Sequence, residues 1–349
     1  MVYAGLDLHK RFSVITAADE RGEELIKQVK VPNDEGRIVK LFRGLDGPVQ
    51  VAMEATRNWQ WLYDLLEENG IEPKLSHPLK TRAIASAKIK NDKIDSKILA
   101  QLLRADLLPL SYVPPKEIRL QRELLRYRAS LVKIQTGVKN RVHSILAKNN
   151  ISHEFSNLFG RKGKAFLRGL SLPQSYHMAL DGYLTLLEVL ALEIKEASKE
   201  IRALAGEDEE ARLLMTIPGV GYYSALLIKC EIGDINRFPS PRKLCAYAGI
   251  IPSTRASGDK VYHGHIIKQG SKWLRWILSE VVEHCMDRPG PLGRYFSRLE
   301  RRKGRNTAKI ATERKLLTWI YYMLKEKKTF QEVEKVAKSW GEPVVTHSR

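Results

Sequence analysis

The chain contains few cysteines and no long apolar run, and each of these absences excludes a class of protein. Its three cysteines, Cys230, Cys245 and Cys285, are odd in number and far apart, so their spacing predicts neither a disulfide framework nor a zinc site. No run of about 18 apolar residues occurs, which excludes a membrane-spanning helix. The first seven residues lack the basic flank and cleavage site of a signal peptide. These features predict a reduced, cytoplasmic protein without a membrane partner.

Acidic residues are also scarce relative to basic ones. The 349 residues include 59 Lys and Arg against 40 Asp and Glu, which gives a formal net charge of +19. This excess favours a polyanionic partner, most simply nucleic acid, and a generic solubilising excess is the alternative. Hydrophobic residues make up 43% of the chain, enough for hydrophobic cores in about two to three domains.

Residues 1–115 have the pattern of an α/β domain. Three strand-like runs come first and are followed by alternating helices and strands: strands at 2–8, 12–18, 25–31, 49–54 and 72–76, with helices at 34–43 and 59–69. This order is typical of a ribonuclease-H-like domain as much as of a Rossmann-like one. No G-x-G-x-x-G motif follows the first strand, which disfavours dinucleotide binding.

Residues 116–208 carry two heptad patterns. The first runs through Leu120, Leu124, Tyr127, Leu131, Ile134 and Val138, and the second covers 180–204. Together they predict an antiparallel coiled-coil arm and a candidate dimer contact, with an ordinary helical hairpin as the alternative. The first helix is basic, because 116–148 contains nine Lys and Arg against two Glu.

Residues 209–349 are predicted to form a mostly helical third domain. Gly219 and Gly221 lie in a peptide that resembles a helix-hairpin-helix turn, in which glycines let backbone N–H groups approach a phosphate. A simple tight turn is an equal alternative. The segment 294–315 has nine basic and two acidic residues and is a candidate nucleic-acid contact, or else a solvated helix face. Its candidate contacts are Arg301, Arg302, Lys303 and Arg305.

Four carboxylates form a candidate metal site. Asp7 and Glu54 end two predicted strands, and Asp92 and Asp95 are three residues apart, so a helix would point both to one face. Converging carboxylates repel one another unless cations neutralise them, and Mg²⁺ prefers oxygen ligands. Two such ions about 4 Å apart are the usual device for displacement at a phosphodiester. The alternative is that each acid is solvated or paired with a neighbouring lysine.

The blocks YAGLDLHK, VAMEATRNW and KNDKIDSKILAQLLR resemble those of the DEDD transposases with a RuvC-like domain. These belong to the one-hundred-and-ten insertion-sequence family, which includes the Piv-type DNA invertases. The segment 215–275, beginning MTIPGVGYYSALLIKCEIGD, resembles the C-terminal block of the same family. The resemblance implies Asp7, Glu54, Asp92 and Asp95 as the acidic positions. It also implies that Ser257 attacks DNA and holds it as a phosphoserine, and that a guide RNA encoded by the element pairs with donor and target DNA.

From the residues alone, Ser257 is a weak candidate, since Ser-Gly is a common turn dipeptide. A serine hydroxyl needs activation by a base, a metal or nearby positive charge. Arg255, Lys260, His263 and His265 lie close enough in the sequence to provide it, and Ser253 is the competing nucleophile. His9 and Lys10, beside Asp7, are interpreted as lining the carboxylate site rather than as catalytic.

The sequence therefore predicts an RNA-guided DNA transposase or recombinase. We expect a ribonuclease-H/RuvC-like domain at 1–115, a coiled-coil arm at 116–208 and a serine-bearing domain at 209–349. The expected cofactor is Mg²⁺, and the expected partners are donor and target DNA, the guide (bridge) RNA and further copies of the chain in a dimer or tetramer. Two alternatives stay open: a RuvC-like junction resolvase, which needs only the four acids, and a non-catalytic nucleic-acid-binding scaffold.

Overall fold

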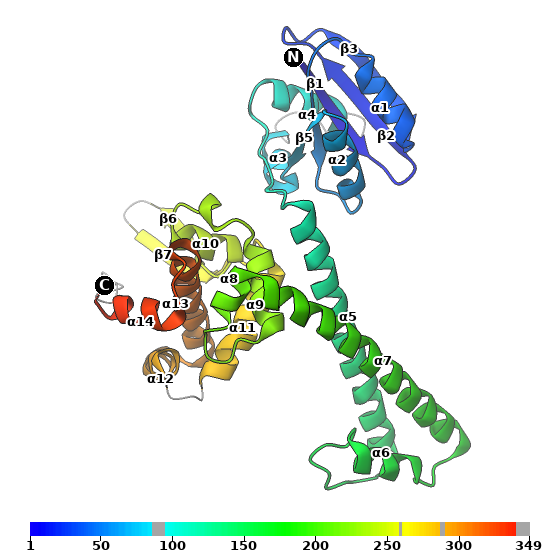
Figure 1. Ribbon diagram of the computed structural model, residues 1–349, viewed down its shortest axis with the longest axis vertical. Helices are drawn as coiled ribbons and strands as arrows, with labels where there is room; N and C mark the ends of the chain where they lie inside the picture. Colours follow the sequence, from blue (N-terminus) through cyan, green and yellow to red (C-terminus); the bar gives the residue numbers. More distant parts are fainter. Residues whose placement is uncertain (86–94, 258–259, 287–289, 340–349) are drawn as a thin grey trace. The chain divides into compact units, whose positions relative to one another are not determined.

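The chain divides into two compact units, residues 1–116 and 117–349. The computed structural model describes residues 1–85, 95–257, 260–286 and 290–339 (Figure 1). No helix within these ranges is long and apolar enough to cross a membrane. The first unit consists of a sheet and helices, and the second is mostly helical.

A mixed five-stranded sheet organises the first unit. Its order is β3-β2-β1-β4-β5; β1 to β3 are antiparallel, and β4 and β5 are parallel to β1. The strands are β1 (Val2–Leu8), β2 (Phe12–Ala18), β3 (Glu24–Pro32), β4 (Val49–Glu54) and β5 (Glu72–Ser76). The helices are α1 (Glu35–Arg43), α2 (Trp59–Glu68), α3 (Pro78–Ala85) and α4 (Asp95–Arg104). The arrangement is consistent with the expected ribonuclease-H-like fold.

Successive side chains of a strand point to opposite faces of the sheet. Leu6 and Met53 belong to the main core, which packs against α1 and α2. On the other face, Ala52 packs against Leu99 of α4. Residues 3, 5 and 7 of β1 alternate with the core residues and therefore lie on the α4 face.

Gly5 lets α4 lie directly against β1. A Cβ atom at this position would be 1.8 Å from the carbonyl oxygen of Ser96, so any larger residue would push the helix away. The hydroxyl groups of Thr16 and Ser96, both buried, form a hydrogen bond of 2.9 Å beside this contact. The position of α4 on the sheet is thus set by backbone contact.

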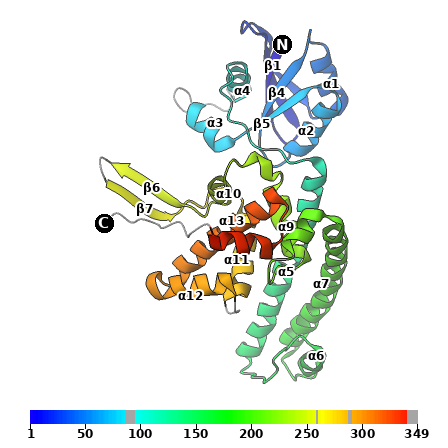
Figure 2. The ribbon, with the colours of Figure 1, turned by 60° about the vertical axis from the view of Figure 1, so that its left-hand side comes forward.

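The second unit begins with two long helices, α5 (Lys116–Lys148) and α7 (Gln174–Glu207), with the short α6 (Arg161–Arg168) at their far end (Figures 1 and 2). A core cluster containing Leu131, Val138, Leu180 and Leu187 joins α5 to α7. The buried positions of α7 match the predicted heptad series in part: Leu187 and Leu190 are buried as predicted, whereas Leu184 is buried in place of Tyr183.

The buried face of α5 differs from the predicted seam near the start of the helix. Leu120, Tyr127 and Ile134 are 64%, 46% and 49% exposed, whereas Gln121 and Leu125 are buried. At Leu120 and Tyr127 the cause is that this part of α5 packs on the helical body: Leu125 belongs to the body's core, and Gln121 accepts a hydrogen bond from Cys230. The heptad pattern on α5 thus includes an exposed apolar stripe.

The helical body surrounds one large core cluster that includes Leu226, Ile277 and Leu316. Its helices are α8 (Glu209–Leu214), α9 (Tyr222–Ile232), the 3-10 helix η2 (Ile235–Arg237), α10 (Pro241–Ala248), α11 (Lys272–Met286), α12 (Pro291–Lys303), α13 (Arg305–Glu326) and α14 (Phe330–Ser339). The antiparallel strands β6 (Pro252–Ser257) and β7 (Lys260–Ile266) project from the body as a hairpin (Figure 2).

All three cysteines are buried in this body. Burial raises the pKa of the Cys230 thiol to about 12 and that of Cys245 to about 11. The Cys285 thiol donates a hydrogen bond to the carbonyl oxygen of Pro218.

Candidate functional site

Two of the four predicted acids lie side by side at one edge of the sheet. Leu6 of β1 pairs with Met53 of the parallel strand β4, so Asp7 and Glu54 are the next residues on neighbouring strands. Such strands are about 4.8 Å apart, and residues in register point to the same face. This face is the one that α4 covers.

The helix that carries the last of the four acids begins close to this edge. Asp95 is the first residue of α4, and Ser96 is in backbone contact with Gly5, two residues before Asp7. The C-terminal ends of β1 and β4 and the start of α4 therefore converge. Asp92 lies outside the described residues, as does the side chain of Asp95.

The Asp7 carboxylate is accessible and lies against the ring of His9. Its Oδ2 atom is 2.9 Å from Nε2 of His9, and the two side chains are 21% and 44% exposed. The His9 ring also packs on Phe12, with the ring centroids 4.6 Å apart. His9 thus contacts Asp7 at this edge of the sheet, and its role in lining a carboxylate site stays a prediction. In the part of the chain that the structure describes, no cluster of three or more His, Cys, Asp and Glu side chains is placed to hold a metal.

The predicted nucleophile lies at the outer end of the hairpin. Ser257 is the last residue of β6 and pairs with Lys260, the first residue of β7, while Arg255 pairs with Tyr262. The side chains of 254–263 lie outside the described part of the structure. The competing Ser253 is near the hairpin base, because a Cβ atom on Gly264 would lie 2.5 Å from its Oγ atom. The two serines are therefore at opposite ends of β6.

Backbone contacts hold the base of the hairpin. The amide groups of Ile267 and Lys268 donate to the carbonyl oxygens of Ile251 and Gly249 at 3.0 and 3.1 Å. Gly270 has φ = +117°, and a Cβ atom there would be 1.9 Å from the carbonyl oxygen of Tyr247. Only glycine allows the returning chain to pass this close in that conformation.

Glu231 is a residue of the body that sequence reasoning missed. Its side chain is 2% exposed and accepts hydrogen bonds from Arg126 at 2.8 Å and from Ser271 at 2.7 Å. The signal was present in the sequence, because a lone carboxylate in the apolar helix ALLIKCEI is costly to bury without partners.

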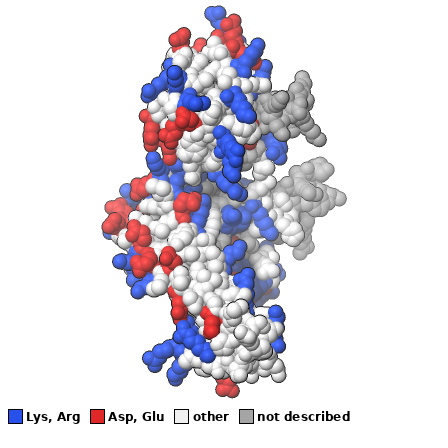
Figure 3. Space-filling view, turned by 90° about the vertical axis from the view of Figure 1, so that its right-hand side faces the viewer, with Lys and Arg blue, Asp and Glu red and all other residues white. Residues whose placement is uncertain are grey.

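The predicted basic contacts are exposed. Arg301, Arg302 and Lys303 end α12, and Arg305 begins α13, where it forms a 3.4 Å ion pair with Glu300. Figure 3 shows exposed Lys and Arg side chains, in blue, on the face that it draws. These positions are compatible with binding a polyanion.

The predicted glycine turn precedes α9. Gly219 adopts φ = +86°, and Gly221 is the N-cap of α9, where an added Cβ atom would meet no described atom within 4 Å. Gly221 has no side chain that could cap α9. The preceding helix α8, by contrast, is capped by the side chain of Asp208. The first amide groups of α9 are thus not covered by a capping side chain.

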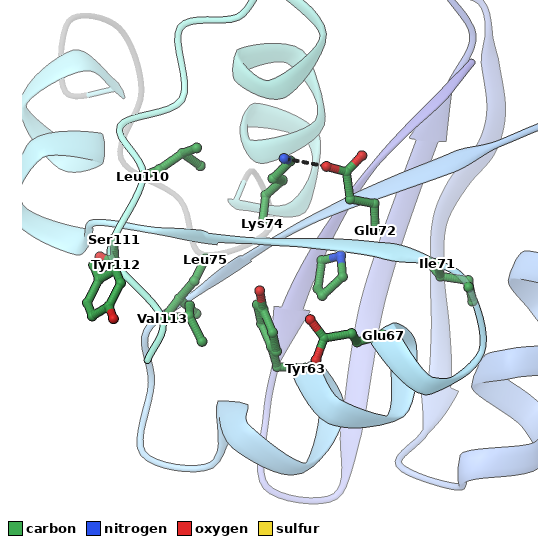
Figure 4. A pocket seen from close by; sticks show the side chains of 12 residues that line it. Tyr63, Glu67, Ile71, Glu72, Lys74, Leu75, Leu110, Ser111, Tyr112 and Val113 are labelled. Carbon is green, nitrogen blue, oxygen red and sulfur yellow. Dashed lines mark ion pairs between the residues drawn. The ribbon is translucent and has the colours of Figure 1, made fainter. Parts of the chain in front are cut away.

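One pocket of about 520 Å³ lies elsewhere in the first unit. It is lined by α2, β5 and residues 110–113, with Tyr63, Lys74 and Tyr112 among its walls (Figure 4). Lys74 forms an ion pair with Glu72 there. Neither Asp7 nor Glu54 lines this pocket, so it is separate from the carboxylate edge.

Comparison with known families matches both units. The DEDD transposase model for IS110 elements covers residues 4–151, and the model of the transposase IS116/IS110/IS902 family covers residues 211–297. The chain belongs to the IS110 family of transposases. The first match includes the sheet with Asp7 and Glu54, and the second includes the hairpin with Ser257.

Relatives of this transposase extend over almost its full length. It is 26% identical over 343 residues to the transposase for insertion sequence element IS1111A of Coxiella burnetii, covering 94% of this chain and 90% of the relative. It is also 26% identical to the transposase for IS1328 of Yersinia enterocolitica, covering 81% and 84%. A 44.8 kDa protein of insertion element IS116 from Streptomyces clavuligerus is 23% identical, covering 94% and 96%. DEDD transposases generally use a divalent metal ion.

Proposed function

We propose that this transposase is an RNA-guided recombinase that cuts and rejoins DNA through two groups of residues. Asp7, Glu54, Asp92 and Asp95 bind Mg²⁺, and Ser257 is the nucleophile that becomes joined to DNA. The observation that carries the proposal is the adjacency of Asp7 and Glu54 at the sheet edge where α4 begins. In this proposal, strands β1 and β4 and the start of α4 contribute the oxygen ligands.

The donor set of this edge suits Mg²⁺. Asp7 is partly exposed, so its oxygen atoms can exchange the contact with His9 for a cation. Carboxylate oxygens are the ligands that this hard cation takes, and it keeps several water molecules. When bound, Mg²⁺ supplies positive charge that stabilises the phosphate during displacement. The protein's part is to hold Asp7 and Glu54 at fixed spacing.

The serine step is a transesterification. The Oγ atom of Ser257 forms a bond to the scissile phosphorus, and the bond from phosphorus to a deoxyribose oxygen breaks. The serine proton ends on that leaving oxygen, so no oxidant or other co-reactant is needed. The hairpin register supports this role, because it puts Ser257 at the outer end of β6, with Lys260 opposite. A cation at Lys260 or Arg255 would stabilise the charge of the transition state.

Recombination also needs two DNA duplexes held together, and hence more than one copy of the chain. The exposed stripe of Leu120, Tyr127 and Ile134 on α5 supports such an assembly, because apolar positions seven residues apart suit helix–helix packing. We propose that α5 and α7 form a coiled-coil arm whose stripe contacts a second copy. The basic ends of α12 and α13 and the turn at Gly219 and Gly221 are proposed to bind the DNA and the guide RNA.

A covalent adduct is the decisive test. The full chain is incubated with Mg²⁺, a labelled duplex carrying the ends of its own element, and the RNA transcribed from the DNA flanking its gene. Denaturing gels should show a protein–DNA adduct for the wild type and for Ser253→Ala, and none for Ser257→Ala. An adduct formed by Ser257→Ala would refute the serine assignment. Cleavage without any adduct would favour the resolvase function, which needs the four acids alone.

A further inference from the structure

Glu231 connects two parts of the second unit that are distant in sequence. Its Oε1 atom accepts a hydrogen bond from Arg126 of α5, and its Oε2 atom accepts one from Ser271, which precedes α11. The carboxylate is 2% exposed, so both oxygen atoms depend on these partners for the hydrogen bonds that water would otherwise provide.

The α5 side of this link is reinforced by a second arginine. Arg122 donates to the carbonyl oxygens of Cys230 at 2.8 Å and Glu231 at 3.2 Å, at the C-terminal end of α9. The Arg126 guanidinium also lies over the Trp273 ring, 5.8 Å from its centroid. Cations at a helix C-terminus are favourable because of the helix dipole. The start of α5 is therefore fixed to α9 by two charged groups.

The Ser271 side leads to the hairpin. Ser271 Oγ donates to Glu231 and accepts from the amide of Leu274 at 3.1 Å, so it also caps α11. Its own amide donates to the carbonyl oxygen of Tyr247, directly after the Gly270 contact. The Tyr247 hydroxyl in turn donates to the carbonyl oxygen of Glu231 at 3.2 Å. Both chain segments at the hairpin base are thus tied to one residue.

We propose that Glu231 is a positioning residue that couples the start of the arm to the hairpin bearing Ser257. The inference rests on the proposed function for its catalytic consequence. Among the described residues, strands β6 and β7 pair only with each other, so their direction depends on the base of the hairpin. Breaking either hydrogen bond of this buried carboxylate is costly, because it leaves a buried charge unpaired. We therefore expect Arg126 and Ser271 to move together with Glu231. Movement of α5 on assembly would then move the hairpin.

Substitutions at Ser271 separate this coupling from the capping of α11. Ser271→Asp keeps a good N-cap residue but places a second carboxylate against Glu231. Ser271→Thr keeps both the cap and the hydroxyl donor. With DNA and RNA already bound, we expect Ser271→Asp to form the adduct about 10- to 100-fold more slowly, since small misplacement of reacting groups has effects of this size. Ser271→Thr should react at the wild-type rate, and DNA affinity should be unchanged in both.

Hydrogen exchange provides a readout that does not depend on the serine chemistry. Ser271→Asp should speed amide exchange both at the hairpin base, 247–251 and 267–271, and in the start of α5, 119–128. Glu231→Gln, which removes the charge and keeps the shape, should do the same more weakly. Wild-type adduct formation and wild-type exchange in α5 for Ser271→Asp would overturn the coupling. If Ser257→Ala still forms an adduct, the proposed function fails, while the exchange result still decides the role of Glu231.

Discussion

The candidate reactive groups of the two units lie on different structures, a five-stranded sheet in the first unit and a two-stranded hairpin in the second. Asp7 lies on β1, which pairs with β2 on one side and β4 on the other, above a core that includes Leu6 and Met53. Ser257 lies on a two-stranded ribbon, and no described residue of β6 or β7 belongs to the large core of its unit. Isolated two-stranded ribbons are marginally stable. The comparison indicates that strand pairing fixes the spacing of Asp7 and Glu54, whereas the direction of β6 depends on the base of the hairpin.

The largest effect is expected from the sheet edge. Asp7→Ala should lower DNA cleavage by at least about 10³-fold, as is typical when a principal electrostatic group is removed, while thermal unfolding stays unchanged. Asp46→Asn, at an exposed acid in the turn before β4, is the matched control and should cleave normally. Retained cleavage by Asp7→Ala, measured on labelled duplex DNA, would show that the sheet edge is not the metal site.

The second prediction concerns the packing of α7 on α5, which is separate from the large core of the helical body. Leu190 is 6% exposed between α7 and α5, and Leu190→Asp should cost more than the roughly 2–5 kcal/mol typical of a buried leucine truncation. The helical content and the midpoint temperature of thermal unfolding, both measured by circular dichroism, should fall. Ile134→Asp, on the exposed stripe, should keep its helical content but sediment as a smaller species. Unchanged sedimentation and helicity for Leu190→Asp would contradict the arm assignment.

Glu313, a buried carboxylate of the helical body, should make the free energy of unfolding depend on pH. Burial raises the pKa of Glu313 to about 7, opposed by Ser279, Lys309 and Arg275 and assisted by Glu283. Because the folded-state pKa lies above the ordinary 4.5, the stabilisation is complete below pH 4.5 and is lost as the pH rises to about 7. Glu313→Gln should therefore raise the free energy of unfolding at pH 8 by up to about 3 kcal/mol, and hardly at pH 5.

Urea unfolding at the two pH values checks this prediction. Glu231→Gln is the internal comparison, because Glu231 is equally buried but fully hydrogen-bonded, whereas Oε1 of Glu313 has no hydrogen-bond partner in the described structure. Glu231→Gln should destabilise the protein, because an amide cannot accept both of the hydrogen bonds that the carboxylate accepts. An equal effect of Glu313→Gln at pH 5 and pH 8 would mean that Glu313 does not titrate in this range.

The smallest effect is expected at the basic surface. Replacing Arg301 and Arg302 by Gln should weaken DNA binding and lower the slope of log affinity against log salt by about 0.9 per lost phosphate contact. Lys195 and Lys199, exposed on α7 among acidic residues, provide the matched control pair and should leave the slope unchanged. Equal slopes for both pairs in fluorescence anisotropy would remove α12 from the proposed nucleic-acid surface.

Local patterns in the sequence predicted several strands well. The strands 2–8, 12–18, 49–54 and 72–76 have the predicted bounds, because charged residues, Gly or Pro delimit each run in the sequence. The heptad pattern failed at Leu120, Tyr127 and Ile134, because it cannot tell which of two neighbours a helix will meet. The contact of Gly5 with Ser96 and the partners of Glu231 are long-range and have no local signature. The sequence predicted Asp7 and Glu54 at the ends of two strands, and the parallel pairing of β1 with β4 brings these ends side by side. The roles of all four acids and of Ser257 stay predictions.

The burial of Cys230, Cys245 and Cys285 has a practical consequence. A thiol reacts through its thiolate form, and pKa values of about 12 and 11 leave almost none of it in Cys230 and Cys245 at neutral pH. A maleimide dye would therefore select a cysteine newly introduced at an exposed position such as Asp46 or Lys195. A variant with Asp46→Cys and Lys195→Cys can thus carry one dye on each unit while the three buried cysteines stay in place. Energy transfer between the two dyes would follow the distance between sheet and arm while DNA and RNA are added.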